Sequence, residues 1–197
     1  MPSYHKHIPP AVNQRSKLRA PLALLATSAA LIAPVLVTSP ATAGNGGIGS
    51  GDGGGDGGGG GEPYTFPVEG KHTYGDGFGA GRGHQGQDVF ARCGKNLVAV
   101  RNAKVQTRGT HSSAGNYIVL DVEGSGLDFT YMHLKKKAIP REGSKVRKGQ
   151  KIGEVGATGN ASGCHLHFEK WSSPGYYEGG SAKPSVTKSL KKWDRYS

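Results

Sequence analysis

The sequence predicts an all-β domain with antiparallel sheets, arranged as a sandwich or a barrel. Several short segments are rich in β-branched and aromatic residues, Gly, Asn or Ser separate them, and the connections are too short for crossover helices. The 34 glycines and the 35% hydrophobic content fit loops and short strands better than a helical bundle. The expected strands are 96–100, 116–122, 127–134, 150–156 and 165–171.

The first 43 residues have the pattern of an export signal. Four basic residues precede an apolar run at 21–37, and small residues at 41–43 provide a cleavage site. The run is short for a bilayer core and contains Pro34. We therefore expect cleavage near Ala43, a secreted or wall-associated protein, and no membrane span in the mature chain. A retained membrane anchor is the alternative.

Residues 44–61 are almost all glycine and predict a flexible, disordered linker, since they carry few side chains to bury. A phosphate-binding glycine loop would need a following helix and a Lys-Ser or Lys-Thr pair, which this stretch lacks. The folded domain is expected at 62–176. A basic C-terminal segment at 177–197 follows, in which 185–196 is expected to form a helical turn or two.

The positive charge of the chain predicts an acidic partner. The net charge of +11 falls to +7 once the four basic residues of the leader are removed. Basic clusters at 135–137 and 145–151 would form the footprint of a nucleic-acid site. An exported protein more often meets an anionic cell wall, so we expect wall binding and no nucleic acid.

Two histidines stand two residues apart in the last expected strand. Side chains at this spacing point to one face of a strand, so His165, His167 and Glu169 share a face while Leu166 and Phe168 point to the other. An isolated pair of this kind is usually solvent-facing. Glu169 either orients a neighbouring histidine or serves as a surface or cross-strand residue.

Other histidines make a metal site possible. His84 precedes Asp88 by four residues in a glycine-rich stretch that predicts a loop running into a strand. His133 ends an alternating strand, and strict alternation places it on the side of Tyr131. Imidazole and carboxylate groups are ordinary zinc ligands, and a catalytic zinc site keeps three of them and one position open to water.

Four ordered segments resemble the lysostaphin-like or LytM-like zinc peptidases of the M23 family. The resemblance covers roughly residues 67–171. It implies a two-sheet domain, similar to a barrel-sandwich hybrid, with a substrate groove over one sheet. The matching segments are GHQGQD (83–88), TYMHL (130–134), KVRKGQKIGEVGATG (145–159) and SGCHLHFE (162–169).

The resemblance also implies the roles of individual residues. His84, Asp88 and His167 match the ligands of one Zn²⁺ ion, and His133 and His165 match two catalytic histidines that do not bind the metal. Which of the two is the general base stays open. His72 and His111 match no family position, and both are expected at the surface.

The implied activity is that of a zinc endopeptidase that uses metal-activated water to hydrolyse peptide cross-links or bridges of bacterial peptidoglycan. A monomer is our own expectation, since the sequence is silent on oligomeric state. A non-catalytic wall-binding or hydrolase-activating module is the alternative. A lipoyl or biotin carrier, whose glycine-turn pattern VRKGQKIGEVG resembles, is disfavoured because no lysine occupies the expected modified turn. Cys93 and Cys164 predict a disulfide in an exported chain, with free thiols or metal ligation as alternatives.

Overall fold

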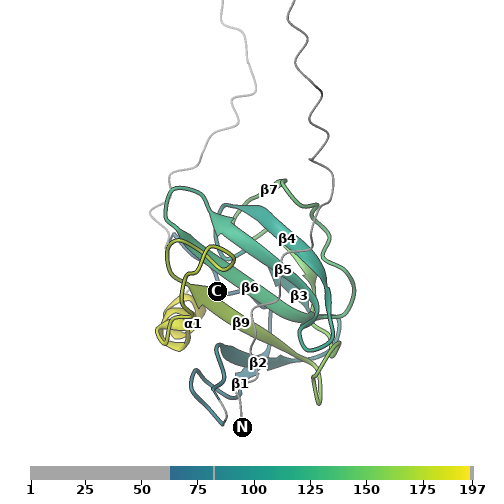
Figure 1. Cartoon of the computed structure of the whole chain (residues 1–197). Coiled ribbons are helices and arrows are strands. Elements are labelled where there is room, and N and C mark those ends of the chain that lie inside the picture. Colours follow the sequence, from purple (N-terminus) through teal and green to yellow (C-terminus); the bar gives the residue numbers. More distant parts are fainter. Residues whose placement is uncertain (1–62, 82, 196–197) are drawn as a thin grey trace, which may run out of the picture. The chain divides into compact units, whose positions relative to one another are not determined.

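The computed structural model describes residues 63–81 and 83–195. This part of the chain forms strands arranged in two antiparallel sheets and one short helix (Figure 1). The all-β, two-sheet prediction is thereby confirmed, although the sheets do not close into a barrel. The expected export signal at 1–43 and linker at 44–61 lie outside the described residues, and the domain boundaries stay predictions.

The larger sheet has seven strands in the order β1-β2-β9-β6-β5-β4-β7. Its strands are β1 (His72–Tyr74), β2 (Gln87–Ala91), β9 (His165–Trp171), β6 (Leu127–Leu134), β5 (Gly115–Val122), β4 (Ala103–His111) and β7 (Lys145–Val146). The smaller sheet pairs β3 (Asn96–Val98) with β8 (Lys151–Glu154). The helix is α1 (Val186–Asp194).

Each of the five expected strands overlaps an observed strand, and β2 is the strand into which the loop of His84 was expected to run, but β1, β4 and β7 were not predicted. Strand β4 (AKVQTRGTH) lacks a clear apolar alternation because Thr107 and Gly109 take the places where apolar residues would continue the pattern of Ala103 and Val105. Strands β1 and β7 are only three and two residues long and lie at the two edges of the sheet. Their formation depends on pairing with a neighbour, which sequence periodicity does not report.

One face of the large sheet carries the main hydrophobic core. Phe129, Tyr131 and Phe168 pack there with residues of the smaller sheet such as Leu97 and Ile152, all of them fully buried. The Tyr131 hydroxyl donates to the carbonyl of Val98 at 3.1 Å and accepts from the N–H of Val100 at 2.9 Å. These bonds satisfy a buried hydroxyl and tie the two sheets together.

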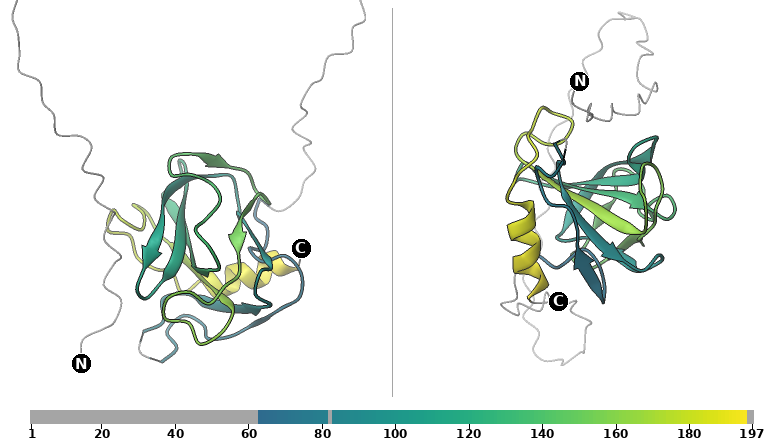
Figure 2. Two further views of the ribbon diagram at one scale, coloured as in Figure 1. Left: turned by 90° about the vertical axis from the view of Figure 1, so that its right-hand side faces the viewer. Right: turned by 90° about the horizontal axis from the view of Figure 1, so that it is seen from below.

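Helix α1 covers the same core. It presents Val186, Leu190 and Trp193 to the core, which is the spacing of one apolar helix face. The Trp193 ring stacks on Tyr64 at a centroid distance of 4.8 Å. In the view from below, α1 runs along one side of the strands (Figure 2). The expected turn or two is thus a helix of nine residues.

Cys93 and Cys164 form a disulfide, as predicted. The bridge joins the connection after β2 to the residue that precedes β9, 71 positions along the chain. Closing a loop of that length is worth about 4 kcal/mol in the chain-entropy account of disulfide stabilisation. The bridge therefore fixes the start of β9 against the end of β2.

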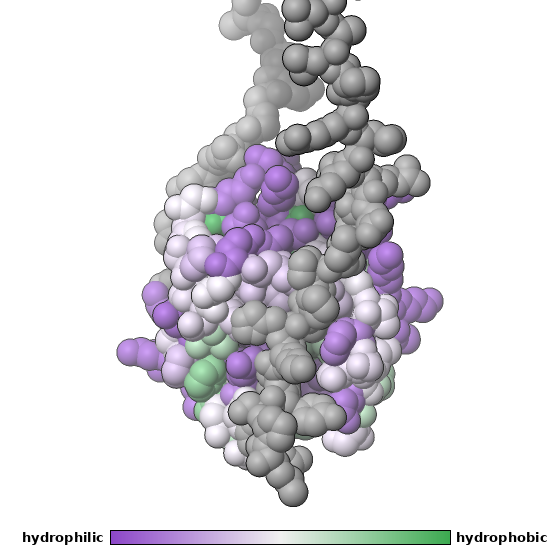
Figure 3. Space-filling view, in the orientation of Figure 1, coloured by the Kyte–Doolittle hydropathy of each residue, from purple (hydrophilic) through white to green (hydrophobic). Residues whose placement is uncertain are grey.

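No helix within residues 63–81 and 83–195 has the length and apolar composition needed to cross a bilayer. On the face shown in Figure 3, hydrophilic colours predominate over the described residues. Two large hydrophobic side chains in this part of the chain are exposed, Phe90 by 41% and Ile139 by 59%. Phe90 lies on the face of the large sheet opposite the main core.

Candidate metal centre

The face of the large sheet opposite the main core gathers the predicted site residues. Strands β2 and β9 pair antiparallel, with Asp88 opposite His167 and Phe90 opposite His165. Since alternate residues of a strand share a face, all four of these side chains project from one surface while Leu166 packs in the core on the other. The pairing register of two strands therefore brings a carboxylate beside two imidazoles.

His84 reaches the same point from the loop before β2. Its Nδ1–H donates to the carbonyl of Gly77 at 2.9 Å, which turns Nε2 toward Asp88 Oδ1 at 3.1 Å. Backbone bonds hold this loop, with the N–H of His84 donating to Ala80 at 3.1 Å. The predicted loop between glycines thus positions the imidazole without a helix.

His167 is oriented from both sides of its ring. Its Nδ1 lies 3.0 Å from Asp88 Oδ1, and its Nε2–H donates to Glu169 Oε1 at 3.0 Å. The other carboxylate oxygen of Glu169 accepts from the indole N–H of Trp171 at 2.8 Å. Glu169, only 2% exposed, is therefore an orienting residue and not a surface residue.

The electrostatics of the cluster centre on Asp88. Burial alone would raise the pKa of Asp88, but hydrogen bonds from His167 and His84 outweigh it and hold the pKa below its ordinary value. The hydrogen bond to Asp88 raises the pKa of His84. Burial opposes protonation of His167, yet its bonds to Asp88 and Glu169 raise the pKa to about 9. The site therefore favours positive charge around one carboxylate.

The donor atoms fit a divalent metal ion. One ligand atom from each of His84, Asp88 and His167 lies within 4.8 Å of the others. One ring nitrogen of His84 donates a hydrogen bond to Gly77, and one of His167 donates to Glu169. When the imidazole is neutral, the other nitrogen of each ring therefore carries a lone pair, which points toward Asp88. Two imidazole nitrogens and a carboxylate oxygen on one point are a common set for first-row metals.

Two further histidines flank this cluster. His165 Nδ1–H donates to the carbonyl of Gly163 at 2.9 Å, and its Nε2 lies 3.8 Å from Asp88 Oδ1. The His133 ring lies 4.7 Å from the His165 ring, measured between centroids. Burial lowers the pKa of His133 to about 4, so its imidazole is neutral at pH 7.

The expectation that His133 shares the side of Tyr131 is wrong. Tyr131 lies in the main core, whereas His133 stands beside His165 on the other face. The pairing of β5 with β6 is irregular here, and His133 has a φ of +63°. This left-handed conformation breaks the alternation, at a cost of about 1–2 kcal/mol for a residue other than glycine. It turns a core-facing position toward the site.

Thr158 holds His133 in this conformation. Its backbone carbonyl accepts the Nδ1–H of His133 at 2.8 Å, which leaves Nε2 as the free nitrogen. The Thr158 hydroxyl donates to the carbonyl of Leu134 at 2.8 Å and accepts from the N–H of Asn116 at 2.9 Å. Sequence reasoning missed this residue, because a backbone acceptor leaves no mark in side-chain chemistry.

Two other supporting residues were also missed. A Cβ on Gly86 would stand 2.7 Å from His167 Nε2, so glycine makes room for this ring. The buried amide of Gln87 donates to the carbonyls of Gly75 and Asp76 at 3.0 and 3.1 Å and fixes the loop beside β2. Both residues lie inside the segment GHQGQD, and their closeness to Asp88 is the only feature of the sequence that could have indicated a supporting role.

His72 is not a surface residue as expected. Its side chain is 13% exposed, its ring stacks on Phe66 at 4.2 Å, and Nε2 lies 3.2 Å from Asp194 Oδ2. His111 is half-buried at the end of β4. Neither belongs to the cluster of His84, Asp88 and His167.

Comparison with known proteins places this arrangement among peptidases. The profile of Peptidase family M23 matches residues 82–179. The peptidoglycan DD-endopeptidase ShyB of Vibrio cholerae is 38% identical over 86 residues, which are 44% of this chain and 20% of that protein. The glycyl-glycine endopeptidase ALE-1 of Staphylococcus capitis is 37% identical over 95 residues, 47% of this chain and 26% of that protein.

Solved structures show the same fold. The catalytic domain of lysostaphin from Staphylococcus simulans is 30% identical, with a TM-score of 0.53, and the match covers 61% of this chain and 92% of that domain. A zinc-containing peptidase from Vibrio cholerae is 31% identical with a TM-score of 0.51, over 55% of this chain and 36% of that one. The chain spans about a fifth of the length of the first curated relatives it matches.

Proposed function

Because the chain belongs to peptidase family M23, we propose that it is a secreted zinc endopeptidase that hydrolyses peptide cross-links or bridges of bacterial peptidoglycan. One observation carries the proposal: ligand atoms of His84, Asp88 and His167 lie within 4.8 Å of one another on a sheet face that also holds two more imidazoles. The peptidoglycan-cleaving activities named for the relatives support this substrate class.

The three proposed ligands would hold one Zn²⁺ ion through His84 Nε2, Asp88 Oδ1 and His167 Nδ1. Zinc, when bound, supplies Lewis acidity and brings the pKa of water to about 7. The bonds of Gly77 and Glu169 to the far nitrogens keep both rings in the tautomers that metal binding requires. Asp88 contributes the negative charge of the set.

His133 and His165 are the proposed catalytic residues. Each donates Nδ1–H to a backbone carbonyl, so that Nε2 is available to take up a proton or, once protonated, to donate a hydrogen bond. One of them would accept a proton from the attacking water and pass it to the leaving amine. The other would stabilise negative charge on the carbonyl oxygen of the scissile bond. These roles suit an acyl-transfer reaction of peptides.

Export and wall association belong to the same proposal. The positive net charge would hold the enzyme at an anionic wall, and salt would weaken that attraction. Retention on purified walls should therefore fall between low and high ionic strength. Unchanged retention would contradict the electrostatic account and leave the peptidase proposal untouched.

The test of the function is turnover of purified peptidoglycan by the full chain, followed by mass spectrometry of the released muropeptides. We expect new peptide termini, loss of activity with a chelator and recovery with Zn²⁺. A non-catalytic module is the second candidate. It is disfavoured because all three proposed metal ligands and both proposed catalytic histidines are present. Wall binding without any new peptide terminus, in protein shown to contain zinc, would establish that second candidate.

A further inference from the structure

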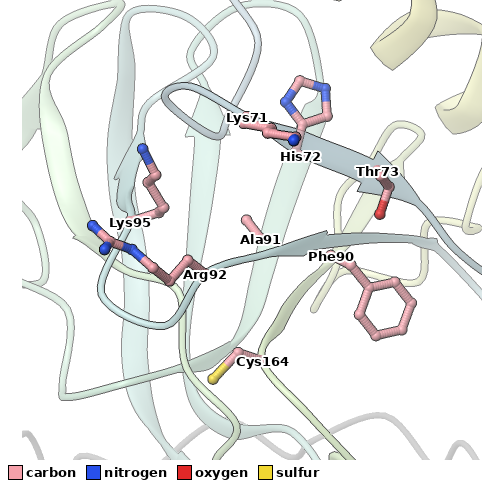
Figure 4. Close-up of a pocket in the computed structure, with 8 residues that line it drawn as sticks. All are labelled: Lys71, His72, Thr73, Phe90, Ala91, Arg92, Lys95 and Cys164. Atoms are coloured by element: carbon pink, nitrogen blue, oxygen red, sulfur yellow. The ribbon is translucent and has the colours of Figure 1, made fainter.

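A pocket lies next to the candidate metal centre. This cationic pocket has a volume of about 500 Å³, and its walls come from β1, β2, the turn after β2 and the start of β9 (Figure 4). The lining residues are Lys71, His72, Thr73, Phe90, Ala91, Arg92, Lys95 and Cys164. None of the residues proposed to bind metal or move protons is among them.

The pocket adjoins the face of the large sheet that bears the candidate metal centre. Phe90 is the cross-strand partner of His165, and the two rings lie 5.3 Å apart between centroids. Cys164 directly precedes His165, and its disulfide to Cys93 fixes that junction. Because a strand rises about 3.4 Å per residue, Phe90 stands about 7 Å along β2 from Asp88. Arg92 lies two residues further along the chain and stands about 14 Å from Asp88 by the same measure. A carboxylate bound between Phe90 and Arg92 is therefore about two to four peptide residues from the bond being cut.

The charge of the pocket is unbalanced. Lys71, Arg92 and Lys95 line it, no acidic residue does, and within the described residues none of the three forms an ion pair with a carboxylate. Lys95 reaches across to the start of β1, where a Cβ on Gly70 would stand 2.9 Å from its Nζ. The glycine thus allows the ammonium group to lie beside the residue that precedes Lys71. Three cations around one hollow favour an anion.

We propose that this pocket binds a carboxylate of the substrate peptide. The inference rests on the proposed peptidase function and narrows it: the preferred substrate is a cross-link between peptides that carry free carboxylates, and not an uncharged glycine bridge. The guanidinium of Arg92 can donate two parallel hydrogen bonds to a carboxylate, while the lysines add charge. The exposed ring of Phe90 offers apolar contact to the aliphatic part of the same residue.

The test compares two synthetic cross-linked peptides that differ only in a carboxylate or a carboxamide two to four residues from the scissile bond. The full chain is measured with Arg92→Ala, Lys95→Ala and the double variant. Lys145→Ala is the matched control, since it removes one charge on β7 at the opposite edge of the sheet. We expect the unmodified enzyme to prefer the carboxylate by about threefold to tenfold in kcat/KM, as for partly exposed charge pairs.

The pocket variants should lose this preference while turnover of the carboxamide stays unchanged, and Lys145→Ala should keep it. Equal turnover of both peptides by the unmodified enzyme would overturn the inference. Binding of both peptides is measured as well. A binding preference for the carboxylate peptide without hydrolysis would support carboxylate binding by the pocket and contradict the proposed peptidase function. If the Arg92 and Lys95 variants lose retention on phosphate-containing wall polymer but keep the preference for the carboxylate peptide, the pocket binds wall phosphate and the inference is overturned.

Discussion

Glu169 accepts the Nε2–H of His167 at 3.0 Å, and this contact determines which nitrogen of His167 faces Asp88. The same carboxylate accepts the indole N–H of Trp171 through its second oxygen. A carboxylate has only acceptor sites, so it suits two converging N–H donors. The position of the proposed third metal ligand therefore depends on a residue that does not itself bind metal.

Replacing Glu169 with Gln should weaken metal binding. The glutamine amide presents one acceptor and one donor, so either His167 or Trp171 would meet an N–H group instead of an oxygen. We expect zinc affinity to fall about 10- to 100-fold, as for other residues that orient metal-bound histidines. Competition with a metal-binding dye measures this. Glu123→Gln, with a side chain 51% exposed, is the control; equal affinities of the two variants would contradict the role of Glu169.

Substitutions in the five-residue cluster should fall into two groups. His167→Ala should remove zinc and activity together, because it deletes a proposed ligand. His133→Ala and His165→Ala should retain zinc and lower kcat about 10²- to 10⁴-fold, as expected for a lost proton-transfer group. Metal analysis of each purified variant separates the groups. Full zinc occupancy in His167→Ala would show that a different imidazole binds the metal.

The sequence predicted the strands that carry their own periodicity and the face of β9 that bears His165 and His167. These two histidines obey alternation because β9 is regular and pairs on both sides. Alternation failed at His133, where a left-handed residue reverses the facing of one side chain. The conformation depends on contacts with Thr158, 25 residues away, so no local pattern records it.

The supporting residues around the cluster were less predictable than the cluster itself. Imidazole and carboxylate groups can be recognised as candidate metal ligands from the residue type alone. Gly86 matters because it has no Cβ, and Gln87 because it donates hydrogen bonds to backbone carbonyls, so neither role can be recognised from the residue type. The cationic pocket was missed because its basic residues are not clustered in sequence. Lys71 and Arg92 become neighbours only when β1 pairs with β2.

The pH dependence of stability should contain a contribution from Asp128. Burial raises the pKa of Asp128 to about 6; the N–H of Tyr176 opposes this shift, and the charges of Asp121 and Glu178 add to it. The folded state therefore binds more protons than the unfolded state between about pH 4 and 6, and this contribution to the free energy of unfolding falls as pH rises through that window.

Asp128→Asn removes this titration and keeps an oxygen that can accept from Tyr176. Its free energy of unfolding relative to the unmodified protein should increase by about 1–3 kcal/mol between pH 4 and pH 7, since one pKa unit corresponds to ~1.4 kcal/mol. Urea denaturation at a series of pH values measures the difference. A difference that stays constant across this range would show that the carboxyl group titrates alike in both states.

Thr130→Val should stabilise the domain. Thr130 lies in the middle of β6 with no exposed surface, and its hydroxyl has no hydrogen-bond partner among the described residues. Valine has nearly the same shape and suits a strand, so the substitution removes an unsatisfied polar group without leaving a cavity. We expect a gain of about 1–2 kcal/mol in the free energy of unfolding.

Thr187→Val is the matched control. The Thr187 hydroxyl donates to the buried side-chain oxygen of Gln87 at 2.7 Å, so losing this hydroxyl should destabilise the domain. Destabilisation by both substitutions to a similar extent would mean that the Thr130 hydroxyl is bonded in solution, most simply to a buried water.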